Sequence, residues 1–106
     1  MARVRTLDFT SAVIAGTPIE FRQGRLMIRT SDTGRYEWDA SSEVRGVDPP
    51  LMQLSTGGDV RVEFETRHNG RFAGRAFVEV SVPASQGSAR TYLRFRGTGP
   101  LEGWTG

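Results

Sequence analysis

The sequence predicts an all-β protein, an antiparallel β-sandwich or flattened barrel forming one domain over residues 1–106, and three observations support this. No ten-residue window keeps apolar residues at the i, i+3, i+4, i+7 spacing of an amphipathic helix, whereas short runs alternate apolar and polar residues with a period of two. Thirteen glycines and five prolines punctuate these runs as turn residues would. A chain of 106 residues can bury roughly two-thirds of its unfolded surface around one core.

A first three-stranded meander is predicted over residues 18–40. Gln23-Gly24 is predicted to form a two-residue turn between its first two strands, because that turn would bring the apolar side chains of both strands to one face. A second turn at 31–34 leads into the third strand, where Trp38 is expected in the core.

A second three-stranded meander is predicted over residues 59–97. Asn69-Gly70 ordinarily indicates a two-residue turn, but that register would mix apolar and charged side chains on each face. A three-residue loop over 68–70, with Gly70 in a left-handed conformation, separates the two faces and pairs Val62 with Ala76.

The last strand of this meander is expected to place Leu93 opposite Val80 and Arg94 opposite Glu79. One face of the meander is then aliphatic, and the other carries alternating charges with two aromatic side chains. This charged outer face consists of Arg61, Glu63, Arg75, Phe77, Glu79, Tyr92, Arg94 and Arg96.

Three further segments complete the expected organisation. A strand near 3–9, with 11–15 as a further candidate, would complete one sheet. The long connector 41–58 either caps one end of the sandwich or presents apolar side chains to a partner, and its apolar residues are Leu51, Met52 and Leu54.

The C-terminal arm, 97–106, follows the last strand. Pro100 gives it an extended direction and cannot donate a hydrogen bond to a strand ladder. We expect Leu101 and Trp104 to pack on a neighbouring subunit in preference to their own domain.

The residues that catalysis requires are scarce in this chain. Cysteine is absent, and the single histidine, His68, lies at a predicted hairpin tip where it has no partner for a catalytic triad. No calcium-binding loop, nucleophile elbow or glycine-rich phosphate loop is present. We therefore expect no enzymatic activity, no cofactor, no metal and no small-molecule substrate.

Charge and hydropathy limit the partners and the location. All 14 basic residues are arginine, but 12 carboxylates bring the net charge to +2 and no basic block appears. The N-terminus lacks the apolar run of a signal peptide, and no stretch is apolar for long enough to span a membrane. The chain is expected to be cytoplasmic, with no membrane partner.

The stretch "GRFAGRAFVEVSVPASQGSARTYLRFRGTGPLEG" resembles the C-terminal third of siphophage major tail proteins, the subunits of the tail tube. The resemblance rests on Gly74 before a strand of small and apolar residues, the polar loop 83–87, the alternating strand 92–95, and Gly-Thr-Gly-Pro-Leu at 97–101. It implies a β-sandwich that assembles as hexameric rings stacked into a tube, with DNA passing as transiting cargo and the virion as final location.

The sequence is compatible with two functions. The first is a structural subunit that assembles with copies of itself into rings or a tube of a phage tail or phage-derived particle, with Leu51, Met52, Leu54, Leu101 and Trp104 at subunit interfaces. The second is a small β-barrel binding module for single-stranded nucleic acid or glycan, since aromatic side chains interleaved with arginine can stack bases.

Overall fold

The computed structural model of the protein describes residues 3–44, 58–68, 70–81 and 91–104. These residues form six strands, and no described segment is a helix that could cross a membrane. The strands are β1 (Arg3–Ile14), β2 (Thr17–Thr30), β3 (Tyr36–Val44), β4 (Val60–Thr66), β5 (Arg71–Ser81) and β6 (Thr91–Gly97).

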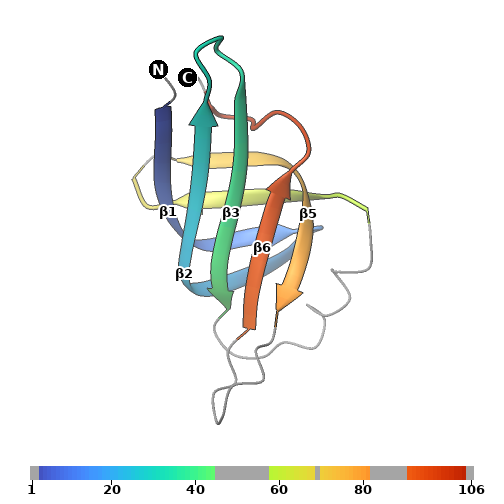
Figure 1. The fold of residues 1–106 in the computed structure, drawn as a ribbon. Helices are drawn as coiled ribbons and strands as arrows, with labels where there is room; N and C mark the ends of the chain where they lie inside the picture. The colour runs from blue at the N-terminus through green and yellow to red at the C-terminus, as the bar shows by residue number, and fades with distance from the viewer. Residues whose placement is uncertain (1–2, 45–57, 69, 82–90, 105–106) are drawn as a thin grey trace.

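The six strands close into an antiparallel barrel in the order β1-β2-β3-β6-β5-β4, with β4 pairing back onto β1. The all-β prediction is therefore confirmed, and the two meanders are β1–β3 and β4–β6. Figure 1 shows β2, β3 and β6 side by side in one layer, with β4 crossing behind them nearly at right angles. The strands β1, β2 and β5 bend from one layer into the other, as in orthogonally packed barrels.

The first hairpin differs from the prediction. Its two-residue turn is Ala15-Gly16, where both residues have positive φ, 49° and 84°, and Ile14 pairs with Thr17. Gln23-Gly24 forms no turn, because β2 runs through it without a break. Gly24 instead leaves room for a core ring, since a Cβ at this position would lie 2.5 Å from Cε2 of Phe9.

A corner lies where β1 and β2 bend. The last regular pair before the corner is Asp8 with Arg25, and the next pair is Ser11 with Glu20. The two intervening residues of β1 therefore lie opposite four intervening residues of β2, and none of these six has a partner in the β1–β2 ladder. The β2–β3 pairing is also irregular here, between Phe21 and Gln23. Such irregularities bend a strand and aim its side chains in new directions.

The second hairpin keeps the predicted faces but not the predicted partners. Gly70 has a φ of 80°, as expected, yet Val62 pairs with Gly74 and Phe64 with Phe72, a shift of two residues. A two-residue shift preserves the side on which each side chain lies because strand residues alternate with a period of two. The loop is closed by Thr66, whose backbone N–H and hydroxyl both donate to the carbonyl of Gly70, at 3.0 and 2.6 Å.

The β5–β6 pairing agrees with the prediction. Val78 pairs with Phe95, Glu79 with Arg94 and Val80 with Leu93. The interior of the barrel is filled by an aromatic cluster in which Phe64 contacts Phe9, Trp38 and Phe95, with ring centroids 4.9 to 5.8 Å apart. This cluster joins the two meanders into one core.

The arm folds onto its own barrel. Trp38 Nε1 donates to the Gly99 carbonyl at 2.9 Å, and the Leu101 N–H donates to the Tyr36 hydroxyl at the same distance. Leu101 is 2% exposed and belongs to the core. This placement differs from the expectation that Leu101 packs on a neighbour, since a side chain buried in its own barrel has no surface to offer one.

Candidate ligand-binding groove

A groove of about 720 Å³ lies on the outside of the barrel. It crosses β2, β3, β6 and the end of β5, so residues from both meanders line it. They are Gln23, Gly24, Arg25, Ser41, Ser42, Glu43, Glu79, Ser81, Tyr92, Leu93 and Arg94.

Short outward-facing side chains leave the surface low in the groove. Ser41 of β3 and Ser81 of β5 are exposed between longer side chains, whereas Gly24 and Ser42 are buried on the core-facing side of their strands. Ser42 is buried, and its hydroxyl donates across the ladder to the Leu93 carbonyl at 3.3 Å. The floor of the groove is thus part of the sheet itself, which makes it a preformed surface.

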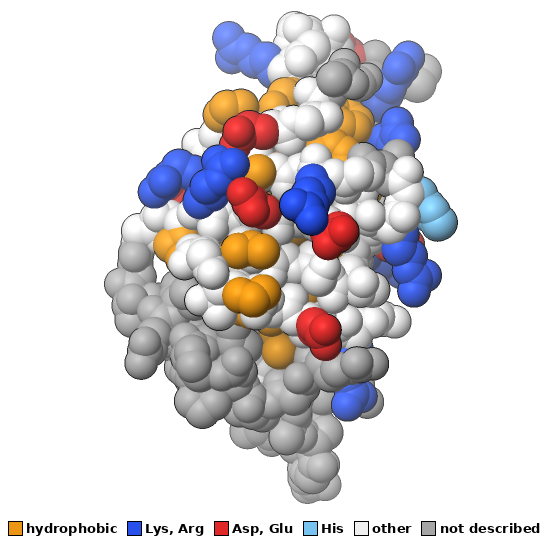
Figure 2. All heavy atoms as spheres, turned by 180° about the vertical axis from the view of Figure 1, so that it is seen from behind, with side chains coloured by type: hydrophobic (Ala, Val, Ile, Leu, Met, Phe, Trp, Pro, Cys, Tyr) orange, Lys and Arg blue, Asp and Glu red, His pale blue; other side chains and the backbone are white. Residues whose placement is uncertain are grey.

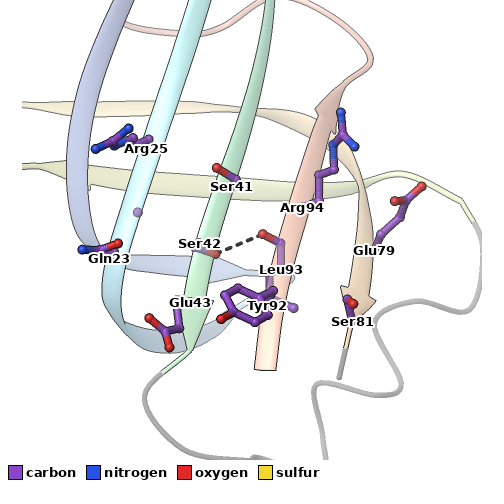
Figure 3. Close-up of a pocket in the computed structure, with 11 residues that line it drawn as sticks. Gln23, Arg25, Ser41, Ser42, Glu43, Glu79, Ser81, Tyr92, Leu93 and Arg94 are labelled. Atoms are coloured by element: carbon purple, nitrogen blue, oxygen red, sulfur yellow. Dashed lines mark hydrogen bonds between the residues drawn. The ribbon is translucent and has the colours of Figure 1, made fainter. Parts of the chain in front are cut away.

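The long side chains stand around this floor in a defined order. Figure 3 shows Arg25 on β2 and Arg94 on β6, with Ser41 of β3 between them, while the ring of Tyr92 lies at the other end of the groove, near Glu43. Tyr92 is 36% exposed, so its ring is accessible to a ligand. The groove therefore combines an aromatic surface, two guanidinium groups and several hydrogen-bonding groups.

A second hollow of about 300 Å³ adjoins the groove at the β1–β2 corner. The two hollows share Gln23, Gly24 and Arg25. The other residues that line the second hollow are Asp8, Phe9, Thr10, Arg22 and Arg67.

The eight residues of the predicted charged outer face all lie on the outside of the barrel, on β4, β5 and β6. Only Glu79, Tyr92 and Arg94 of these line the groove. Figure 2 shows the side of the molecule turned away in Figure 1, where acidic and basic side chains are interspersed and do not form a patch of one sign.

Two arginines of this face are held by carboxylates. Arg75 donates from Nε and Nη2 to the two carboxylate oxygens of Asp59, both at 3.1 Å, and Arg61 donates to Glu102 at 2.6 Å. The register places Arg75 opposite Arg61, and the carboxylates of Asp59, Glu63 and Glu102 pair with these two arginines.

These contacts shift the ionisation of the groups involved. The hydrogen bond from Arg75, followed by one from the Thr98 hydroxyl, lowers the pKa of Asp59. The hydrogen bond to Glu102 raises the pKa of Arg61, and the bond to Asp59 raises the pKa of Arg75. Both guanidinium groups are thus engaged within the molecule.

The predicted interface residues separate into three groups. Leu51, Met52 and Leu54 lie outside the described residues. Leu101 is in the core, as stated above. Trp104 is half-buried against that core, and the guanidinium carbon of Arg5 lies 5.8 Å from the centroid of its ring.

No group of three or more metal-binding side chains comes together within the described ranges. His68 is exposed beside the β4–β5 hairpin loop, where the sequence placed it.

Sequence reasoning missed the β2 and β3 part of the groove. It placed Gln23 and Gly24 in a turn, and it counted Ser41 and Glu43 as connector, whereas β3 continues to Val44. The alternation Trp38, Ala40, Ser42, Val44 on one face was the available signal that the strand extends into this region.

Comparison with known proteins gives no match to a protein-family model, to a curated protein or to a solved structure.

Proposed function

We propose that the protein is a non-enzymatic binding module that takes single-stranded nucleic acid in the groove across β2, β3, β6 and β5. The observation that carries this proposal is the accessible ring of Tyr92 in a preformed hollow that also contains Arg25 and Arg94. Proteins that hold single strands combine such stacking surfaces with groups that follow the phosphate backbone.

The groove suits a chain more than a compact ligand. It extends over four strands, and its hydrogen-bonding groups include an amide at Gln23 and hydroxyls at Ser41 and Ser81. These groups offer both donors and acceptors to the edges of a base. Stacking on Tyr92 would contribute about 1–3 kcal/mol per base.

The charges indicate modest electrostatic binding. Arg25 and Arg94 are accompanied by Glu43 and Glu79, so the groove alone is balanced, and the adjoining hollow adds two arginines and one carboxylate. At most four arginines can contact phosphates. For single strands, a plot of log K against log salt concentration has a slope of about −0.7 for each phosphate that the protein neutralises. Four arginines should therefore give a slope no steeper than roughly −3.

The test is fluorescence anisotropy of a short labelled oligothymidine at low salt. Tyr92→Ala should weaken binding by about 5- to 150-fold, the equivalent of 1–3 kcal/mol. Phe77→Ala is the matched control, because Phe77 is 46% exposed but lies outside the groove, and it should leave affinity within about twofold.

Two results would contradict the proposal. One is no binding by the unaltered protein at low salt. The other is binding of a neutral oligosaccharide, and not of the oligonucleotide, in a manner that depends on Tyr92, since this would assign the groove to a glycan.

Self-assembly into rings or a tube is the second candidate, and one feature favours it. Phe77 is exposed on β5 between charges of both signs, including the neighbouring Arg75 and Glu79. An apolar centre with mixed charges around it can be complementary to a second copy of the same surface. Assembly through the β4–β5–β6 face is therefore a specific alternative to ligand binding.

The same two variants separate the candidates. If the face of Phe77 mediates assembly, negative-stain electron microscopy should show rings or tubes that Phe77→Ala abolishes and Tyr92→Ala retains. A monomer at every concentration reached in analytical ultracentrifugation would exclude this alternative.

A further inference from the structure

The hollow at the β1–β2 corner has an unusual arrangement of charge. Three arginines line it: Arg22 and Arg25 from β2, and Arg67 from the segment that follows β4. Among the described residues that line it, Asp8 is the one carboxylate. The described residues that line this hollow therefore carry a formal net charge of +2.

These three arginines differ from the paired arginines elsewhere. Arg29, Arg61 and Arg75 each contact a carboxylate within the described chain. Among the described residues, by contrast, Arg22, Arg25 and Arg67 form no ion pair within 4.0 Å. Three guanidinium groups that repel one another around one hollow lower their mutual energy when an anion occupies it.

The backbone at this corner is held by a hydrogen bond between two of its segments. The Arg67 N–H donates to the Asp8 carbonyl at 3.0 Å, which ties the loop to β1 beside the hollow. The β1–β2 ladder is interrupted beside the hollow, and Thr10 and Gln23 are among the residues that have no partner in that ladder. Bulges often re-aim side chains in this way next to binding sites.

We propose that this corner hollow is a binding site for a phosphate group, held by Arg22, Arg25 and Arg67. Guanidinium groups match phosphate because their planar array of N–H donors forms paired, charge-assisted hydrogen bonds to its oxygens. A volume of about 300 Å³ accommodates one phosphate, or a diphosphate, together with water.

This inference rests on the proposed function in one respect. The two hollows share Gln23, Gly24 and Arg25, so a strand with one phosphate at the corner could extend into the groove that contains Tyr92. The phosphate would belong to the backbone of the strand whose base stacks on Tyr92. The same chemistry would also hold a free phosphate or diphosphate, and the experiment distinguishes these sources.

The first measurement is isothermal titration calorimetry with pyrophosphate at low ionic strength, since this probe needs no groove. The protein should bind it, and Arg22→Gln and Arg67→Gln should each weaken binding about 10-fold or more, the loss of a charge-assisted hydrogen bond of about 1.5–3 kcal/mol. Arg96→Gln is the control, because it removes the same charge from an exposed arginine that lines neither hollow.

The second measurement repeats the oligothymidine titration with the same variants. Arg22→Gln and Arg67→Gln should each reduce the slope of log K against log salt by about 0.7, whereas Tyr92→Ala should leave both that slope and pyrophosphate binding unchanged. Thermal unfolding by circular dichroism confirms that each variant is folded before it is titrated.

The outcomes separate the two proposals. Pyrophosphate binding that depends on Arg67, without oligonucleotide binding, supports the phosphate site and overturns the nucleic-acid function. Oligonucleotide binding that depends on Tyr92 but not on Arg22 or Arg67 overturns the phosphate site alone. An equal loss of pyrophosphate binding in Arg96→Gln and Arg67→Gln would show that only net charge matters, and it too overturns the site.

Discussion

The absence of a side chain at Gly97 allows Trp38 to pack against the backbone of β6. The indole of Trp38 packs directly on the Gly97 backbone, and a Cβ at this position would lie 2.4 Å from Cε2 of that ring. Gly74 of β5 contacts the same indole, and a Cβ built there would lie 2.7 Å from its Cζ2 atom. Gly97 of the C-terminal motif therefore allows the close approach of an aromatic side chain.

We expect Gly97→Ala to destabilise the protein by about 1–3 kcal/mol, because the buried indole must move or leave its rotamer. Gly99→Ala is the matched control, since nothing lies within 4 Å of a Cβ built there, and it should change stability by less than about 0.5 kcal/mol. Urea unfolding followed by circular dichroism measures both, and equal effects of the two substitutions would show that the contact with Trp38 is not the cause.

Asp59 provides a prediction about pH. Its pKa is lowered from 3.8 by the hydrogen bonds from Arg75 and Thr98, so its contribution to stability is present above about pH 3.8 and is lost as the pH falls through the lowered pKa. Asp59→Asn should flatten the acid limb of a plot of unfolding free energy against pH. Plots that run parallel from neutral pH through the whole acid limb would contradict this role, because the contribution of Asp59 must disappear as the pH falls.

At the scale of elements, the β1–β2 hairpin carries identifiable strain. Ala15 occupies the left-handed region with a φ of 49°, in a two-residue turn where glycine and asparagine are favoured. Ala15→Gly should therefore raise the melting temperature, with a gain of up to about 1 kcal/mol after the extra backbone entropy of glycine.

Gly16→Ala is the reciprocal change and should lower stability by about 1–2 kcal/mol, since it forces alanine to a φ of 84°. No atom lies within 4 Å of the added methyl, so the loss would come from backbone conformation alone. A melting temperature that falls in Ala15→Gly would overturn this account of the turn.

The β5–β6 and β1–β2 hairpins show what the sequence could and could not predict. Alternation alone identified the pairing of Val78 with Phe95 and of Val80 with Leu93 in β5–β6, because one face there is uniformly apolar and a one-residue slip would expose it. Alternation could not choose between Ala15-Gly16 and Gln23-Gly24 as the turn, since glycine serves turns and close packing equally. The contact of Gly24 with Phe9 depends on a residue fifteen positions away, and local pattern contains no trace of it.

The candidate site was predicted in part for the same reason. Tyr92, Glu79 and Arg94 were found because the β5–β6 register was right. Gln23, Arg25 and Ser41 were missed because they reach the groove only once β2 is continuous and β3 lies beside β6. Likewise, the C-terminal motif predicted an extended arm, but it did not predict that Leu101 packs in the core of its own barrel. There the Leu101 N–H donates to the hydroxyl of Tyr36, a residue sixty-five positions away.

The barrel as a whole should unfold in one step. Each strand pairs with two neighbours, the first strand closes onto the fourth, and the aromatic cluster connects both meanders. We expect far-ultraviolet and near-ultraviolet circular dichroism to give coincident thermal transitions, as in other small cooperative domains. A separate earlier transition in the near-ultraviolet signal would show that the arm leaves the barrel before the sheet melts.

The hydrogen bond from Trp38 to Gly99 has a practical consequence. The indole of Trp38, against which the arm packs, lies in the core beside the backbones of Gly74 and Gly97. Its N–H group donates to the Gly99 carbonyl of the arm. In a Trp104→Phe background it is the single tryptophan of the chain, so its emission maximum would report arm docking directly. The protein thus carries an intrinsic optical probe, and motion of its C-terminal segment during ligand binding or assembly can be followed without attaching a dye.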